Sequence, residues 1–310
     1  MKIAIDVGFG DTKVVSFLNK KINKLKFPTA ISYYKSGFNL GDFSKKELIY
    51  NMNGVDYLVG VDAIKDALTT RDIDFLIKFS PLFIYKALTN LNLIKENIDL
   101  ALGLPLLYYS DYSDALKKSM INSKVNDLEF KNYIKTVRVY PQGVGILMNQ
   151  MIDDNMKINS SKIKNSIIVD VGYNTVDIIV TSEGKAIKNE CAFYENKGII
   201  ELVNGVKNAV RNEFKIEISE AEAQKILIDK EFLHTDFSKT INIEKQKYAE
   251  WLDFELKGKF KDRFVRADEI IISGGGANYL KEFSNKKNFT ISSSEYSNAI
   301  GFLKLSTNEN

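Results

Sequence analysis

The sequence has one cysteine, Cys191, and one histidine, His234. A disulfide within the chain is therefore excluded, and so is a zinc site that needs several cysteine or histidine ligands. There are four prolines and no tract rich in glycine and serine, so no segment has the composition of a linker. The longest apolar run, LALGLPLLYY from Leu100, is too short to span a bilayer and contains a proline.

An excess of charge of either sign is also missing. The 43 lysines and arginines stand against 40 aspartates and glutamates, and the net charge of +3 does not by itself indicate a nucleic acid or a membrane as partner. The chain starts with an apolar stretch that Asp6 interrupts, which does not fit the core of a signal peptide. We therefore expect a cytoplasmic protein, and its 310 residues favour two domains over one.

The apolar pattern predicts that strands and helices alternate in both halves of the chain, so the expected fold class is α/β. In the first half we expect strands at 2–7, 13–17, 25–27, 98–102 and 133–140, and helices at 73–91, from a cap at Ser110 or Asp111, and from a first turn at Pro141. In the second half we expect strands at 166–170, 175–181, 185–193, 269–272 and 289–291. Helices are expected there at 198–213, from a capping box of Ser219 and Glu222, at 244–264, and from Glu295.

Two short stretches of the chain share one apolar pattern and four identical residues. IAIDVGFGDTKVV (Ile3–Val15) and IIVDVGYNTVDII (Ile167–Ile179) align without a gap and share Asp-Val-Gly at the same place. Each copy predicts a β-hairpin, in which an apolar strand ends in a carboxylate and a glycine and a second apolar strand returns. Because the copies lie half the chain apart, they indicate a duplicated fold.

The tip of such a hairpin suits a phosphate group. Glycine lets backbone N–H groups approach a ligand closely, and successive N–H groups form a concave anion site. A carboxylate is repelled by phosphate unless a hydrated Mg²⁺ lies between them, so we expect Asp6 and Asp170 to hold the metal through water. A single hairpin of this kind is more often a plain turn, whereas two copies favour a two-sided grip on a polyphosphate.

The chain resembles the actin superfamily in five segments, which occur in the family's order. DVGFGDTK (Asp6–Lys13) and DVGYNTVDI (Asp170–Ile178) resemble its phosphate loops, VYPQGVGILM (Val139–Met148) and EYSNAIGFLKL (Glu295–Leu305) its connecting helices, and IIISGGGANYL (Ile270–Leu280) its adenosine motif. The resemblance covers nearly the whole chain and is closest to the ParM-like branch, the bacterial and archaeal actin-like ATPases of plasmid segregation. It implies a duplicated, ribonuclease H-like ATPase fold with two domains flanking a nucleotide cleft.

The resemblance also implies where the domains lie. Actin-like domain I is expected at 1–150 plus about 292–310, with a small insertion at about 28–75. Domain II is expected at 151–291, with a helical insertion at about 198–264.

The site that the resemblance implies holds ATP or ADP and Mg²⁺. Gln142 is expected to orient the water that attacks the γ-phosphate, with Asp6 and Asp170 as the other catalytic residues. The residues expected to contact the nucleotide belong to the hairpin tips and to glycine-containing turns: Gly8, Phe9, Gly10, Asp11, Thr12, Lys13, Gly172, Tyr173, Asn174, Thr175, Gly198, Gly274, Gly275, Gly276 and Asn278. The alternatives are a solvated Lys13 and a glycine triplet that is only a hinge. Asn174 is expected to replace a glycine of the family by adopting a left-handed backbone.

The superfamily contains filament-forming ATPases, chaperone ATPases and small-metabolite kinases, so the fold does not decide the function. A chaperone has a peptide-binding domain after its ATPase domain, and here the sequence ends soon after the second connecting segment. A kinase needs a general base for its acceptor; Asp72, Asp74 and Asp111 are available, but none stands in a recognisable sugar motif.

We therefore expect a slow, assembly-stimulated ATPase that polymerises with ATP and Mg²⁺, for plasmid or DNA segregation or for intracellular positioning. The alternative is a kinase that transfers phosphate to a hydroxyl or carboxylate of a small metabolite. The expected partners are further copies of the chain and an adaptor protein that links it to DNA, because the sequence shows no basic recognition helix or other nucleic-acid motif and no membrane anchor.

Overall fold

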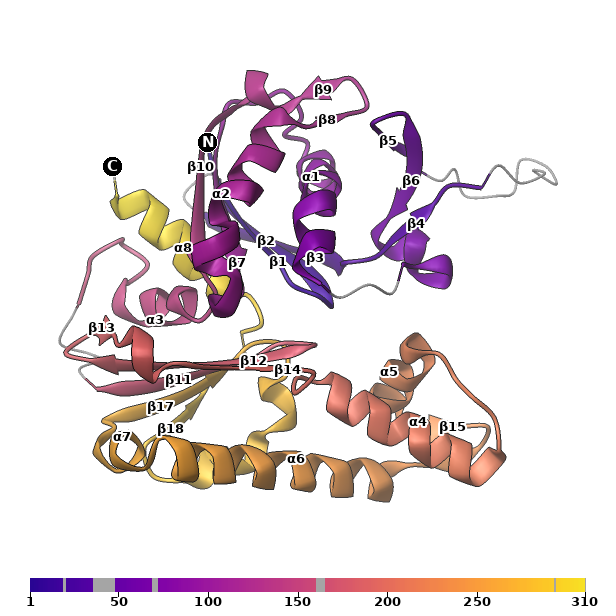
Figure 1. Cartoon of the computed structure of the whole chain (residues 1–310), viewed down its shortest axis with the longest axis vertical. Helices are drawn as coiled ribbons and strands as arrows, with labels where there is room; N and C mark the ends of the chain where they lie inside the picture. Colours follow the sequence, from indigo (N-terminus) through magenta and orange to yellow (C-terminus); the bar gives the residue numbers. More distant parts are fainter. Residues whose placement is uncertain (19–20, 36–47, 69–71, 160–164, 293, 310) are drawn as a thin grey trace. The chain divides into compact units, whose positions relative to one another are not determined.

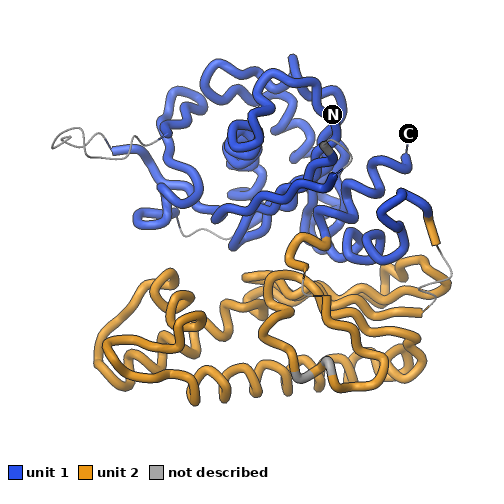
Figure 2. Tube along the Cα trace, turned by 180° about the vertical axis from the view of Figure 1, so that it is seen from behind, with its two compact units in different colours: residues 1–157, 298–310 blue, residues 158–297 orange. Residues whose placement is uncertain are grey.

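The computed structural model describes residues 1–18, 21–35, 48–68, 72–159, 165–292 and 294–309. The chain divides into two compact units, residues 1–157 with 298–310 and residues 158–297 (Figure 2). Each unit is built around one mixed β-sheet with helices packed on it (Figure 1). The duplicated α/β fold that the sequence predicts is confirmed.

The main sheet of the first unit has the strand order β10-β7-β1-β2-β3. Its strands are β1 (Lys2–Val7), β2 (Asp11–Leu18), β3 (Lys21–Pro28), β7 (Ile98–Leu104) and β10 (Ile134–Pro141). Strands β1, β2 and β3 pair antiparallel as two hairpins, whereas β7 and β10 run parallel to β1. The carboxyl ends of β1, β7 and β10 therefore meet at one edge of the sheet, which is where ligands bind in open α/β sheets.

Helices cover both faces of this sheet. They are α1 (Ile73–Asn90), α2 (Leu106–Asn122), α3 (Val144–Met151) and α8 (Ser297–Asn308). Side chains alternate along β7: Leu100, Leu102 and Leu104 join the core formed with α1 and α2, whereas Gly103 faces Phe302 of α8. The C-terminal helix α8 thus packs on the face of this sheet that lies opposite to α1 and α2.

A second, smaller sheet belongs to the same unit, with the order β4-β6-β5-β8-β9. Its strands are β4 (Ile31–Tyr33), β5 (Tyr50–Met52), β6 (Val55–Val59), β8 (Lys124–Val125) and β9 (Leu128–Glu129). Short 3₁₀ helices lie at Gly60–Asp66 and Phe130–Asn132. Residues 36–47 and 69–71 of the expected insertion at 28–75 lie outside the described residues.

The main sheet of the second unit repeats the pattern of the first. Its order is β13-β12-β11-β17-β18, and β14 also pairs with β12. The strands are β11 (Ser166–Val171), β12 (Thr175–Ser182), β13 (Lys185–Ala186), β14 (Ala192–Glu195), β17 (Glu269–Ser273) and β18 (Phe289–Ile291). Strands β11 and β12 form an antiparallel hairpin, and β17 and β18 run parallel to β11. Here too the first strand of the hairpin, β11, has a parallel neighbour, β17, so the carboxyl ends of the two strands meet at one edge of the sheet.

The helices of the second unit are α4 (Ile200–Phe214), α5 (Glu220–Asp229), α6 (Ser238–Lys259) and α7 (Lys261–Arg266). A short hairpin of β15 (Glu231–Phe232) and β16 (Thr235–Asp236) precedes α6, which runs along the sheet in Figure 1. Leu252 and Leu256 of α6 join Ile270 and Ile272 of β17 in one apolar core. In the part of the chain that the structure describes, no helix is both long and apolar enough to cross a membrane.

Two helix starts differ from the sequence-based expectation. Helix α2 begins at Leu106 with Pro105 as its cap, so Ser110 and Asp111 lie inside the helix and neither is its N-cap. The fixed φ of proline suits a helix start without any side-chain cap. Pro141 ends strand β10 and does not open a helix, because Gly143 interrupts the path with φ +78° before α3 starts. The capping box of Ser219 and Glu222 on α5 is confirmed.

Two longer elements are interrupted. The strand expected at 185–193 consists of β13, a 3₁₀ turn at Lys188–Glu190 and β14. The helix expected at 244–264 starts earlier, at Ser238, and Phe260 separates α6 from α7. Phe260 is buried in the core of the second unit.

Candidate functional site

The first predicted phosphate hairpin joins β1 to β2. At its tip the N–H of Gly8 donates to the carbonyl oxygen of Asp11 at 3.2 Å. A Cβ on Gly8 would lie 3.2 Å from that same oxygen and 3.7 Å from Nζ of Lys13, so the ammonium group of Lys13 lies beside the tip. Thr12 is buried, and its hydroxyl shares a hydrogen bond of 2.9 Å with the hydroxyl of Thr29. Phe9, Gly10 and Asp11 are partly exposed along the turn.

Asp6 and Gln142 are joined at the carboxyl edge of the first sheet. Nε2 of Gln142 donates to Oδ1 of Asp6 at 2.6 Å, and the two residues are 7% and 3% exposed. The backbone N–H of Gln142 donates to the carbonyl oxygen of Leu104 at 2.7 Å. A Cβ on Gly103 would lie 3.1 Å from Oδ1 of Asp6, so glycine at this position leaves room for the carboxylate. The three parallel strands therefore bring the predicted glutamine and the first predicted carboxylate into direct contact.

The second predicted phosphate hairpin joins β11 to β12 and carries the start of α4. The N–H of Gly172 donates to the carbonyl oxygen of Thr175 at 2.9 Å. The N–H groups of residues 198–200 donate to the carbonyl oxygens of residues 172–174 at 2.9 to 3.3 Å. The first N–H groups of a helix have no partner within the helix, and at the start of α4 the carbonyl oxygens of the hairpin tip accept from them. A Cβ on Gly198 would lie 2.5 Å from the carbonyl oxygens of Gly172 and Tyr173, so only glycine fits there.

The start of α4 is fixed from a second direction. The hydroxyl of Tyr248 on α6 donates to the carbonyl oxygen of Lys197 at 2.6 Å. Burial raises the pKa of Tyr248, so this hydroxyl remains a donor over the physiological pH range. Lys197 itself pairs with Glu201 at 3.1 Å. The hairpin tip is thus held by a helix whose own position is fixed by α6.

The glycine triplet at 274–276 wraps around the end of β11. Strands β11 and β17 are parallel neighbours, and Asp170 lies opposite Ser273. Gly274 has φ +92°, and a Cβ there would overlap the carboxylate of Asp170. The N–H of Gly276 donates to the carbonyl oxygen of Val171 at 2.8 Å, and a Cβ on Gly276 would overlap Val171. A Cβ on Gly275 meets no atom within 4 Å. Packing therefore requires the outer two glycines, and the middle one presents open backbone.

The three remaining predicted residues have different surroundings. Asn174 is 5% exposed, and its Oδ1 has no hydrogen-bond partner among the described residues. The hydroxyl of Tyr173 donates to Glu220 at 3.1 Å and accepts from Gln224 at 2.8 Å, which ties the tip to α5. Asn278 is exposed on the 3₁₀ turn that follows the glycine triplet.

The left-handed backbone expected at Asn174 is wrong. Asn174 is not among the described residues with positive φ. The turn closes without it, because the Gly172–Thr175 hydrogen bond and the N–H groups at the start of α4 hold the tip.

The donor atoms in each unit fit a hydrated magnesium ion and a nucleotide. Among the described residues, no three histidine, cysteine, aspartate or glutamate side chains gather as a metal site. One buried carboxylate per hairpin suits Mg²⁺, which keeps several waters and takes one or two carboxylates together with phosphate oxygens. The unpaired Oδ1 of Asn174 and the open backbone at Gly275 are the kind of polar surface that a ligand can complete.

Two family models match the chain. The model of the N-terminal domain of actin-like proteins matches residues 4–145. The model of the C-terminal domain of MreB-like archaeal actin homologues matches residues 168–285. The chain belongs to the actin-like proteins. No curated protein sequence matches it.

Solved structures show the same fold over the full length of this actin-like chain. A 15-stranded ParM filament from Clostridium botulinum is 20% identical, with a TM-score of 0.75 and 99% of each chain covered. An archaeal actin homologue in complex with ADP is 16% identical, with a TM-score of 0.76 and the same coverage. Bacillus thuringiensis ParM with AMPPNP is 15% identical, with a TM-score of 0.68 and 98% of each chain covered. At these identities the likeness shows the two-domain actin-like fold.

Sequence reasoning missed three residues near Gln142, namely Gly143, Gly145 and Asn298. Gly143 follows Gln142, and its N–H donates to Oδ1 of Asn298 at 2.8 Å. Gly145 lies against Gly301 where α3 crosses α8. The signal was present as small residues in both connecting segments, but which of them face each other depends on the crossing of two helices that are far apart in sequence.

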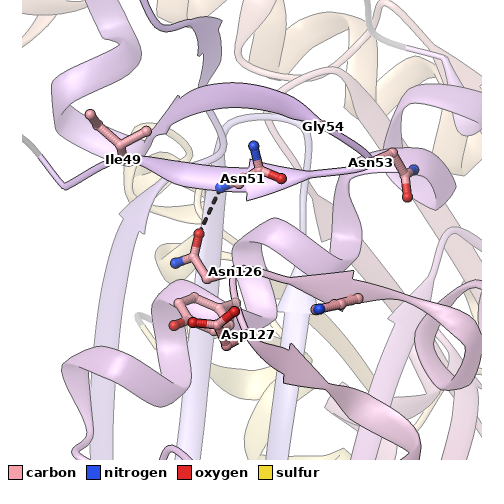
Figure 3. A pocket seen from close by; sticks show the side chains of 8 residues that line it. Ile49, Asn51, Asn53, Gly54, Asn126 and Asp127 are labelled. Atoms are coloured by element: carbon pink, nitrogen blue, oxygen red, sulfur yellow. Dashed lines mark hydrogen bonds between the residues drawn. The ribbon is translucent and has the colours of Figure 1, made fainter.

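A large cavity lies elsewhere in the first unit of the actin-like chain. It has a volume of about 820 Å³ and lies between the β5–β6 turn and the β8–β9 turn (Figure 3). Strand β5 is joined to the β8–β9 turn by the N–H of Asn51, which donates to Oδ1 of Asn126 at 2.8 Å (Figure 3). Its lining residues are Ile49, Asn51, Asn53, Gly54, Tyr85, Lys124, Asn126 and Asp127, and none of them is a predicted site residue.

Proposed function

We propose that this actin-like protein is a cytoplasmic ATPase that assembles into filaments with ATP and Mg²⁺. Its proposed role is to segregate plasmid or other DNA, or to position cargo, through an adaptor protein. The observation that carries the proposal is the pair of hairpins, each with a buried carboxylate and a glycine tip at the carboxyl edge of its own sheet. Relatives described as a ParM filament and as an archaeal actin homologue in complex with ADP support filament formation and nucleotide binding.

In the proposed mechanism the hairpin tip of each unit contacts nucleotide phosphate. Asp6 and Asp170 would hold the waters of Mg²⁺, and Lys13 would contact phosphate at the first hairpin. Gly275 offers open backbone to the adenosine, while Gly274 and Gly276 shape the turn around Asp170. When bound, Mg²⁺ supplies charge neutralisation at the phosphates.

The orientation of Gln142 favours water as the acceptor of the phosphoryl group. A carboxylate only accepts hydrogen bonds, so the amide nitrogen of Gln142 must face Asp6. The carbonyl oxygen Oε1 is then left to accept a hydrogen bond from a water molecule. A neutral amide orients water but does not remove its proton strongly, which fits slow hydrolysis. A kinase would instead need a base close to a substrate hydroxyl.

The proposal is tested with the purified full chain. Electron microscopy and sedimentation with and without Mg-ATP should show filaments only with nucleotide, and free phosphate should be released without any added sugar or acid. Asp170→Ala should abolish turnover or weaken nucleotide binding, whereas Asp127→Ala, an exposed aspartate of the β8–β9 turn, should behave as wild type. A chain that stays monomeric with ATP and phosphorylates a small metabolite would establish the kinase alternative. Wild-type affinity and turnover in Asp170→Ala would remove the proposed site.

A further inference from the structure

Asn298 contacts the backbone directly behind Gln142. It is the second residue of α8 and is 5% exposed. Its Oδ1 accepts a hydrogen bond of 2.8 Å from the N–H of Gly143. That N–H belongs to the same peptide group as the carbonyl of Gln142, so the bond restrains the peptide plane that follows the glutamine.

The backbone at Gly143 has little local support of its own. Gly143 has φ +78° and ψ −39°, and it stands before α3 without a side-chain cap. Strand β10 has ended at Pro141, so the N–H of Gly143 has no partner in the β-sheet. The N–H of Gln142 is taken by Leu104 and the N–H of Gly143 by Asn298. A buried N–H that loses its acceptor drives local rearrangement, because the unpaired state is unfavourable.

We propose that Asn298 is a positioning residue for hydrolysis, which acts through Gly143 and Gln142 and does not touch the nucleotide. The inference rests on the proposed function of Gln142. The side chain of Asn298 fixes the orientation of the peptide between Gln142 and Gly143, and this peptide fixes the position of the Gln142 Cα. From there the amide nitrogen of Gln142 reaches Oδ1 of Asp6 at 2.6 Å.

The rest of α8 leaves α3 little freedom to compensate. Gly145 and Gly301 meet backbone to backbone. At the other end of α3, Nζ of the buried Lys304 donates to the carbonyl oxygen of Ile152 at 2.8 Å and pairs with Asp154 at 3.1 Å. Helix α3 is thus held by α8 in its first turn and just beyond its end. Asn298 is also the first residue of the C-terminal segment that belongs to the first unit, so Gln142 is tied to the chain where it leaves the second unit.

The experiment is a double-mutant cycle on phosphate release, with nucleotide affinity measured in parallel. Asn298→Ala and Gln142→Ala should each lower kcat by about 10- to 100-fold, because catalytic rates fall steeply with small misplacements, and should leave nucleotide affinity within about twofold. The double variant should lose no more than Gln142→Ala alone, because both changes act on one group. Asn308→Ala, an asparagine at the exposed end of the same helix, is the matched control and should keep wild-type turnover.

Hydrogen–deuterium exchange tests, independently of phosphate release, whether Asn298 restrains the segment around Gly143. In Asn298→Ala, amide exchange in the peptide spanning 141–147 should rise about tenfold while exchange in β1 and α1 stays unchanged. If the alanine variant does not fold, Asn298→Asp, which keeps the accepting oxygen, must retain wild-type protection at Gly143 and wild-type turnover. A double variant that multiplies the two losses, or unchanged exchange at 141–147, overturns the inference. A wild-type chain that releases no phosphate would overturn the proposed function, and the exchange result would then still decide whether Asn298 fixes this segment.

Discussion

Gly145 and Gly301 lie backbone to backbone where α3 crosses α8. A Cβ on Gly301 would overlap the carbonyl oxygen of Gly145, and a Cβ on Gly145 would lie 2.5 Å from the carbonyl oxygen of Asn298. Neither glycine has a positive φ. Glycine is therefore needed at both positions for the close approach of two helices and not for an unusual backbone conformation.

We predict that Gly301→Ala destabilises the protein by about 2 to 4 kcal/mol, because the new methyl group forces the two helices apart in a packed interior. Gly258→Ala is the matched control: this glycine lies in α6, and a Cβ there meets no atom within 4 Å. The control should be stabilising by about 0.5 to 1 kcal/mol, the difference in helix propensity. Urea denaturation measures both values, and equal stability of Gly301→Ala and wild type would contradict the tight crossing.

Local signals allowed much of the fold to be predicted from the sequence. The hairpins follow from alternating apolar strands around Asp-Val-Gly, and the start of α5 follows from Ser219 and Glu222, which cap each other within one turn. Each of these features depends on residues close together in the chain.

The parts that were not predictable depend on contacts between distant segments. Helix α2 begins at Leu106, and its cap Pro105 offers no polar side chain, so the first apolar residues of the helix resemble a continuation of β7. Whether Gln142 opens a helix or ends a strand is decided by the turn at Gly143, which Asn298 stabilises from 155 residues away. Asn174 shows the converse, since its tip is closed by N–H groups of α4 and not by a backbone preference of its own.

The hydroxyl of Tyr173 links the second hairpin to α5, and Tyr173→Phe should loosen this link. The loss of one donor and one acceptor contact should lower the stability by about 0.5 to 1.5 kcal/mol. Because the tip also contributes to the proposed phosphate site, nucleotide affinity should fall as well. Thermal unfolding and nucleotide titration measure the two effects. Tyr112→Phe, on α2 of the first unit, is the control and should change neither quantity. If Tyr173→Phe lowers the stability without any change in nucleotide affinity, the tip does not depend on α5.

The ion pair of Glu190 and Arg263 should make stability depend on pH in the acid range. Arg263 donates to both carboxylate oxygens of Glu190, at 2.6 and 2.8 Å. These hydrogen bonds hold the pKa of Glu190 below its ordinary value of 4.5. A carboxylate with a lowered pKa in the folded state stabilises the protein above pH 4.5, and this contribution disappears as the pH falls through the lowered pKa.

We therefore predict that Glu190→Gln lowers Tm at neutral pH and that the difference from wild type closes in strong acid. Because both side chains are partly exposed, the difference should also shrink at high salt. Glu217→Gln removes a more exposed, single-contact pair with Arg211 and serves as the control with little change at any pH. A Tm difference that is the same at pH 7 and pH 3 would assign the effect to packing and not to charge.

Hydrolysis should accelerate when the subunits assemble. A glutamine such as Gln142 can orient a water molecule but is not a strong base, and the only histidine, His234, is exposed on the β15–β16 hairpin and belongs to none of the five motif segments. The rate must then depend mainly on how well Gln142, the hairpins and the nucleotide are preorganised, and contacts between subunits are a source of such ordering.

We predict that phosphate release per subunit is slow below the concentration at which filaments sediment and rises to a plateau above it. Gln142→Ala should remove the plateau while filaments still form with ATP, because the glutamine acts on the water and not on the subunit contacts. A release rate per subunit that stays constant across the assembly range would mean that the site is already fully ordered in the monomer.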